Sequence, residues 1–260
     1  MQIKLVACDL DGTLIDGIPI LPEVKEFIVK IRQRGIKFVI NSGRSLENIL
    51  DILSQSKVSC PAGYPEAIIS KHGVFIHYLK GQIYIEDEEW NKVREKELKI
   101  LKQEIGWKSK LWEKIIEEKF KIYPVSKNID YGVFAVSFKK NEEAEKIKKV
   151  LLKDSNFKYT TFLRNRFFLT AALSTTQKGS SLARVAEHFK IPPSQVLAIG
   201  DSQNDEHMLN GKYGFIPAAP SNAEDNIKQL VRSQKGFVAS LPEGKGVIEI
   251  VSSLLNGSKS

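Results

Sequence analysis

The stretch IKLVACDLDGTL, residues 3–14, decides the fold because an apolar run leads directly into two aspartates and a glycine. The run Ile3–Cys8 holds a single lysine, which is typical of a strand covered on both faces. Asp9 and Asp11 follow at positions i and i+2, so in an extended chain their side chains point the same way. Carboxylates this close repel unless a cation joins them or one stays protonated.

Apolar strands and amphipathic helices alternate through the rest of the N-terminal third. Pro22 opens a helix that Gly35 ends, and Ser45 or a neighbour caps a second helix. This βαβαβ order predicts a parallel, doubly wound sheet. The strands expected are Ile3–Cys8, Ile36–Ile40 and Ala67–Ser70, with a hairpin over Val74–Ile85.

The middle of the chain has a different order of predicted helices and strands. Residues 86–120 read as a long, lysine-rich helix, and Val133–Phe138 and Tyr159–Leu173 predict strands around a helix at Glu142–Leu152. After Lys178 the parallel pattern returns. We therefore predict an α/β, Rossmann-like, doubly wound core with an inserted α+β cap domain. The expected boundaries are 1–80 and 176–260 for the core and 81–175 for the cap.

Polar clusters follow three of the predicted core strands, where ligands bind in open parallel sheets. Singly, such residues are common in turns and helix caps, but together they favour a hard divalent cation, for which magnesium suits a phosphate-handling site. Lys178, Ser42 and the backbone near Gly43 are candidates to hold a phosphate. The clusters are Asp9 and Asp11; Asn41, Ser42 and Arg44; and Asp201, Asn204 and Asp205.

Composition limits the partners. The net charge is +8, but lysines alternate with glutamates, as in Glu142–Lys149, so the charge is spread over solvated helix faces and no nucleic acid is expected. Two cysteines, Cys8 and Cys60, form no disulfide framework, which favours a reducing, cytoplasmic setting. No leader or long apolar run is found, so no membrane is expected. We expect a monomer or a homodimer.

Four motifs in order resemble those of the haloacid dehalogenase superfamily: DLDGTL at 9–14, Ser42-Gly43-Arg44, Lys178-Gly179 and GDSQND at 200–205. The insertion between the second and third motifs resembles the branch with a large cap (subclass IIB), which includes Cof-type and sucrose-phosphate phosphatases. The chain departs from that branch at Ser42, where threonine is common, and at Ser70–Gly73, where Asn-Gly is common.

The resemblance implies a role for each matching residue. Asp9 is the nucleophile and a metal ligand. Asp11 is the general acid and base, with its backbone carbonyl on the metal, and Thr13 supports Asp11. The phosphoryl group is held by Ser42, Gly43, Lys178 and Asn204, and the metal site is completed by Asp201 and Asp205.

These roles predict a Mg²⁺-dependent phosphatase for a small phosphorylated molecule, a sugar phosphate or a phosphoglycolate-like compound. A phosphosugar mutase and a non-catalytic regulatory module remain as alternatives. Arg164 and Arg166 in the cap are candidates for substrate specificity, since arginine binds anionic groups, and so is Arg44. His72 and His77 are expected to be ordinary residues.

Overall fold

The computed structural model describes residues 2–17, 19–58, 62–130, 133–154 and 157–256. The chain divides into two compact units. The first combines residues 1–91 with residues 177–260, and the second is residues 92–176. The second unit is thus inserted between two halves of the first, which is the arrangement that the changes of sequence rhythm indicate.

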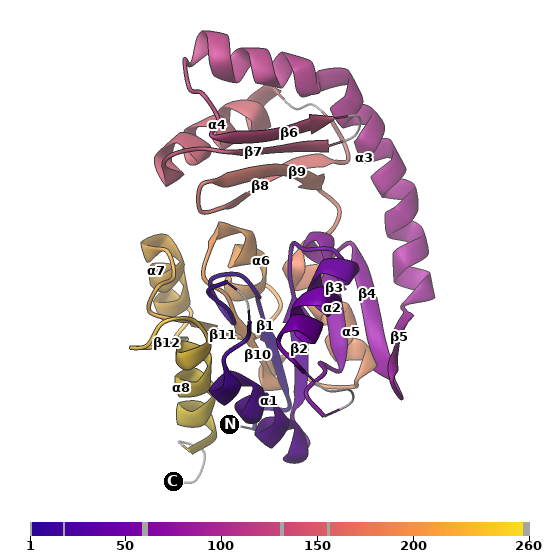
Figure 1. Ribbon diagram of the computed structural model, residues 1–260, viewed down its shortest axis with the longest axis vertical. Coiled ribbons are helices and arrows are strands. Elements are labelled where there is room, and N and C mark those ends of the chain that lie inside the picture. The colour runs from indigo at the N-terminus through magenta and orange to yellow at the C-terminus, as the bar shows by residue number, and fades with distance from the viewer. Residues whose placement is uncertain (1, 18, 59–61, 131–132, 155–156, 257–260) are drawn as a thin grey trace. The chain divides into compact units, whose positions relative to one another are not determined.

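The first unit is built on an eight-stranded sheet in the order β12-β11-β10-β1-β2-β3-β4-β5 (Figure 1). The pairs from β12 to β3 are parallel, whereas β4 and β5 form an antiparallel hairpin at the edge. The strands are β1 (Leu5–Cys8), β2 (Lys37–Asn41), β3 (Ala67–Ser70), β4 (Phe75–Lys80), β5 (Ile83–Glu86), β10 (Val196–Ile199), β11 (Ile216–Ala219) and β12 (Phe237–Val238).

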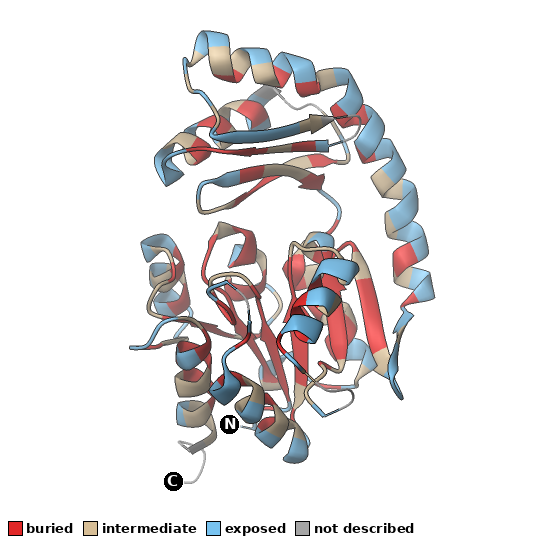
Figure 2. Ribbon diagram, viewed as in Figure 1, coloured by how far each residue is buried: buried red, intermediate tan, exposed pale blue. Residues whose placement is uncertain are grey.

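Helices cover both faces of this sheet because alternate residues of each strand point to opposite sides. Val6 and Cys8 of β1 pack in the cluster with α1, α2 and α8, whereas Leu5 and Ala7 pack in the cluster with α5, α6 and α7. Figure 2 shows the central strands buried along their length. The helices are α1 (Pro22–Gln33), α2 (Leu46–Gln55), α5 (Lys178–His188), α6 (Glu206–Leu209), α7 (Asp225–Ser233) and α8 (Glu243–Asn256), with short turns η1 (Lys71–Gly73), η3 (Pro193–Gln195) and η4 (Gln203–Asp205).

The second unit, the segment predicted as the cap and called the cap below, is α+β with an antiparallel sheet in the order β6-β7-β9-β8. Its core centres on Trp112, whose ring meets Phe134 and Phe162 edge-on at centroid distances of 5.3 and 4.9 Å. The elements are α3 (Glu88–Lys114), which begins in the first unit, η2 (Ile115–Lys119), β6 (Ser126–Asp130), β7 (Val133–Ser137), α4 (Asn141–Asp154), β8 (Thr160–Asn165) and β9 (Phe168–Leu173).

The predicted fold class is confirmed, and two local features differ from the expectation. Strand β5 lies beyond residue 80 but hydrogen-bonds to β4 in the main sheet. Strand β6 was not predicted, because its sequence SKNID is polar and resembles a loop. Within the described residues, no helix combines the length and the apolar composition that a bilayer span requires.

Candidate active site

The polar clusters meet at one edge of the main sheet. Strand β1 lies between β10 and β2, and all three run parallel. Asp9 follows β1, Ser42 follows β2, and Asp201 lies just beyond β10. The chain builds the sheet to one side of β1 with β2 and β3 and to the other side with β10 to β12, so the site lies at a topological switch point.

A tight loop after β1 fixes where the first two aspartates lie. The carbonyl of Leu10 accepts hydrogen bonds from the amides of Leu14 and Ile15, each at 2.9 Å. Gly12 takes a φ of 76°, which a residue with a side chain adopts at a cost. Residues 10–15 therefore form a tight turn directly after Asp9.

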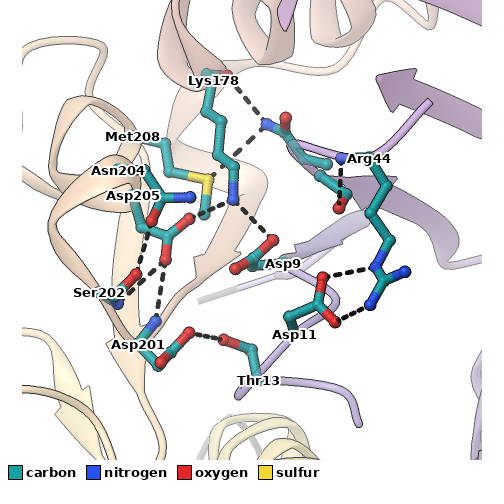
Figure 3. A network of polar contacts seen from close by, with 12 residues as sticks. Asp9, Asp11, Thr13, Arg44, Lys178, Asp201, Ser202, Asn204, Asp205 and Met208 are labelled. Atoms are coloured by element: carbon teal, nitrogen blue, oxygen red, sulfur yellow. Dashed lines mark hydrogen bonds and ion pairs between the residues drawn. The ribbon is translucent and has the colours of Figure 1, made fainter. Parts of the chain in front are cut away.

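Lys178 ties the clusters together electrostatically (Figure 3). It is the first residue of α5, and its Nζ lies 2.6 Å from Asp9 Oδ1 and 2.6 Å from Asp205 Oδ1. All three side chains are buried. Burial alone would lower the pKa of Lys178, but the carboxylates of Asp205 and Asp9 outweigh it and raise that pKa above its usual range.

Asp205 closes the loop after β10. Its Oδ2 accepts hydrogen bonds from the amides of Asp201 (3.0 Å) and Ser202 (3.1 Å), while its Oδ1 accepts from Lys178. Gly200 leaves the room for this, since a Cβ at Gly200 would lie 2.5 Å from the Asp205 carboxyl carbon. Asp205 therefore shapes the backbone around Asp201.

The residues at this site fit a divalent cation. Asp9, Asp201 and Asp205 are buried and can bring one oxygen each within 4.8 Å of one another. Asp9 Oδ2 is buried without a hydrogen-bond partner. Burial raises the pKa of Asp9 well above its usual value, with further increases from Asp205 and Asp201, whereas Lys178 lowers it. Three carboxylates and one lysine leave two negative charges when all are ionised, the charge that one divalent ion balances.

The hydroxyl of Thr13 binds one of these three buried aspartates. Its hydroxyl donates to Asp201 Oδ1 at 3.0 Å (Figure 3). This hydrogen bond crosses the sheet edge and orients Asp201, and the support of Asp11 by Thr13 stays a prediction. Such partners of metal-ligating carboxylates position the ligand oxygens.

Asp11 pairs with Arg44 on the side of Asp9 away from Asp205 (Figure 3). Arg44 Nε donates to Asp11 Oδ2 and its terminal nitrogen donates to Asp11 Oδ1, each at 2.8 Å. Both side chains remain more than a third exposed. The hydrogen bond to Asp11 raises the pKa of Arg44. The arginine proposed for specificity is therefore engaged with the residue proposed as acid and base.

Two other predicted phosphate-binding residues, Ser42 and Asn204, lie buried just after β2 and β10. Ser42 is buried, and its hydroxyl accepts from the Arg44 amide at 3.2 Å, which leaves its own O–H as a donor. Asn204 is buried in η4, and its Oδ1 accepts from the Ser202 hydroxyl at 2.6 Å. Together with Lys178 they supply donors suited to phosphate oxygens.

In the cap, Arg164 takes part in an ion pair. Its Nε donates to Glu145 Oε2 at 3.0 Å, and a terminal nitrogen donates to the Arg166 carbonyl at 2.8 Å. Arg164 is buried, whereas Arg166 lies in the turn between β8 and β9 with a φ of 49°. Their role in specificity stays a prediction.

Asn41 lies in the polar cluster after the second strand, but its sequence context predicted no role for it. Asn41 Nδ2 donates to the carbonyl of Lys178 at 2.9 Å and approaches Met208 Sδ at 3.8 Å. The end of β2 thereby fixes the start of α5. The signal available in the sequence was an amide side chain directly before a Ser-Gly turn.

Comparisons with known proteins place the whole chain among phosphatases. The family described as sucrose-6F-phosphate phosphohydrolase matches residues 2–253. The chain is 25% identical to phosphatase YwpJ of Bacillus subtilis, over 87% of this chain and 92% of that protein. It is 26% identical to a phosphoglycolate phosphatase of Thermoplasma volcanium, over 96% and 98%.

The fold also matches that of a solved structure over nearly the full length of both chains. The sucrose-phosphatase of Synechocystis sp. PCC6803, in complex with sucrose and phosphate, superposes with a TM-score of 0.66 at 15% identity, over 97% of this chain and 98% of that one. This likeness concerns the fold alone. With the family match over nearly the whole chain, it follows that the chain belongs to the sucrose-6F-phosphate phosphohydrolase family of haloacid dehalogenase-like phosphatases.

Proposed function

We propose that this phosphatase is magnesium-dependent and hydrolyses a small phosphorylated metabolite, a sugar phosphate or a phosphoglycolate-like compound, through an aspartyl phosphate on Asp9. One observation carries the proposal: Asp9 holds one carboxylate oxygen on Lys178 and leaves the other buried without a partner. An unpartnered buried oxygen is costly in a finished structure, and a metal ion would satisfy it.

Asp9, Asp201 and Asp205 would hold the ion, with the backbone carbonyl of Asp11. Asp205 already accepts from Lys178 and two amides, so Asp9 and Asp201 are the stronger candidates for direct ligands. When bound, magnesium would neutralise charge between the carboxylate nucleophile and the anionic phosphate. Lys178, Ser42 and Asn204 would orient the phosphoryl oxygens.

The reaction would proceed in two displacements. An oxygen of Asp9 attacks phosphorus, the bond from phosphorus to the ester oxygen breaks, and Asp11 gives a proton to the departing alkoxide. Asp11 then takes a proton from a water molecule that attacks the same phosphorus, which frees Asp9 and releases inorganic phosphate. Both oxygens of Asp11 accept from Arg44 here, so Asp11 acts as an acid after at least one of these hydrogen bonds opens.

The test is release of inorganic phosphate from a panel of sugar phosphates, phosphoglycolate and glycosyl phosphoglycerates, with and without Mg²⁺. We expect magnesium-dependent release that Asp9→Asn abolishes. The variant should stay folded, because it keeps the shape of the side chain and removes a buried charge. Isomerisation of a sugar phosphate without release of phosphate would instead favour a mutase. Absence of any reaction from the folded protein would contradict the proposal.

A further inference from the structure

The short turn η1 is enclosed by the two loops that contain the predicted phosphate-binding residues. The amide of His72 donates to the Ser42 carbonyl at 3.1 Å, and the amide of Lys71 donates to the Arg44 carbonyl at 2.8 Å. On the other side, a Cβ at Gly73 would lie 2.8 Å from the Gln177 carbonyl, directly before Lys178. The turn is therefore fixed between the Ser42–Arg44 loop and the start of α5.

The backbone of this turn is strained. Lys71 has a φ of 49° and His72 a φ of 58° with a ψ of 34°, so two consecutive residues with side chains adopt the left-handed conformation. Such conformations persist where the surrounding structure enforces them, and they concentrate at ligand sites. The enforced backbone therefore fixes the position from which the His72 side chain extends.

The imidazole of His72 lies against Gly43. A Cβ at Gly43 would lie 2.6 Å from His72 Nε2 and 3.0 Å from Nδ1, so the absence of a side chain at Gly43 makes room for the ring. His72 Nδ1 is buried and has no hydrogen-bond partner. Burial, with a smaller contribution from Lys178, lowers the pKa of His72 to about 3. The ring is therefore neutral near pH 7, with one N–H donor and one acceptor nitrogen.

We propose that His72 is an additional binding residue of the phosphate pocket, and that its N–H donates to an oxygen of the phosphoryl group held by Ser42 and Lys178. With the proton on Nδ1, a phosphate oxygen is the acceptor that this buried nitrogen lacks. A neutral donor here adds a hydrogen bond without adding a second positive charge beside Lys178. This inference rests on the proposed function and adds a binding group to the same site.

The experiment compares His72→Ala with His72→Asn in the full-length chain. Asparagine tolerates the left-handed backbone and keeps an N–H donor on a short side chain, whereas alanine removes the donor. The readouts are the KM for the best substrate of the panel and the inhibition constant of inorganic phosphate. A hydrogen bond to a charged acceptor is worth about 1.5–3 kcal/mol, so both constants should rise about tenfold or more in His72→Ala and less than about threefold in His72→Asn.

His77→Ala is the matched control. His77 is also buried with an unpartnered Nδ1, but it lies in β4 with its Nε2 4.0 Å from Glu86. We expect its KM and phosphate inhibition to stay at wild-type values. The pH–rate profile of His72→Ala should keep the wild-type shape, since a neutral imidazole transfers no proton. A lost limb in that profile would contradict the binding role.

The outcomes separate this inference from the proposed function. Wild-type protein that neither releases nor binds phosphate would overturn both. Normal wild-type turnover with unchanged constants in His72→Ala, or equal losses in His72→Ala and His72→Asn, would overturn the role of His72 alone. If His72→Ala fails to fold, His72→Asp takes its place against His72→Asn, since the two have the same shape. Equal phosphate inhibition of that pair would then refute the contact.

Discussion

Replacing Lys178 by methionine should destabilise the metal-free protein strongly at neutral pH. Lys178 Nζ contacts two buried carboxylates, Asp9 and Asp205, each at 2.6 Å. Removing one partner of a buried ion pair costs about 3–5 kcal/mol, because the opposite charge stays buried without compensation. For a chain of this size that corresponds to a fall in Tm of about 6–20 °C.

The pH dependence identifies the cause. Burial, with the neighbouring Asp205 and Asp201, already raises the pKa of Asp9 well above its usual value, and Lys178 is the group that opposes this, so losing Lys178 raises the pKa of Asp9 further. A raised pKa removes stability as pH increases, so the deficit should be full near pH 7 and should shrink toward pH 4. The second substitution Asp205→Asn should recover part of the loss. Added Mg²⁺ should also recover part of it, since the ion binds the folded state.

The assay is thermal unfolding of wild type, Lys178→Met and the double variant at several pH values in a metal chelator. Lys110→Met is the control, since Lys110 is exposed and its nitrogen lies 3.9 Å from Glu113. We expect little change in that control. Wild-type Tm for Lys178→Met at pH 7, or a deficit that grows as pH falls, would refute the electrostatic account of the site.

Three further predictions follow from single contacts. Thr13→Val should raise the Mg²⁺ concentration for half-maximal activity by about 10–100-fold, because Asp201 loses its orienting hydrogen bond. Thr13→Ser keeps the hydroxyl and should leave that concentration unchanged. The same Mg²⁺ dependence of activity in both variants would contradict this role. Arg44→Lys should lower kcat by about tenfold or more with Tm nearly unchanged, because lysine lacks the planar fork that keeps Asp11 in position through one hydrogen bond while the other opens. An unchanged kcat would show that the pair is dispensable. Gly43→Ala should weaken inhibition by inorganic phosphate, because the new Cβ displaces the His72 ring. The double variant Gly43→Ala/His72→Ala should bind phosphate only slightly more weakly than Gly43→Ala. Additive losses of phosphate binding would show that the two residues act separately.

The sequence predicted the main sheet well because its parallel strands are continuous apolar runs. Leu5–Cys8 and Val196–Ile199 are fully buried, as runs without alternation indicate. Strand β6 escaped prediction because it is a polar strand at the edge of the cap sheet, held by pairing with β7 rather than by burial. Edge pairing of this kind depends on tertiary contacts that local propensity does not record.

The site was predictable in part for a related reason. Asp9, Asp201 and Asp205 follow strand ends, so topology brings them together once the sheet order is known. The pairing of Arg44 with Asp11 and the hydrogen bond from Thr13 to Asp201 depend on side-chain directions in turns. The enclosure of His72 between two loops depends on backbone angles at Lys71 and His72, for which the residue types give no signal.

The most direct test of the central claim is capture of the covalent intermediate on Asp9. Asp11→Asn should slow hydrolysis of the aspartyl phosphate, since it removes the base that activates water. The variant would be mixed with Mg²⁺ and p-nitrophenyl phosphate, whose leaving group departs without a proton from Asp11, then quenched in acid within the first turnover and digested for mass spectrometry. We expect a peptide containing Asp9 that carries one added phosphoryl group, absent in Asp9→Asn. Substrate turnover with no phosphorylated peptide, or with the phosphoryl group on another residue, would contradict Asp9 as the nucleophile.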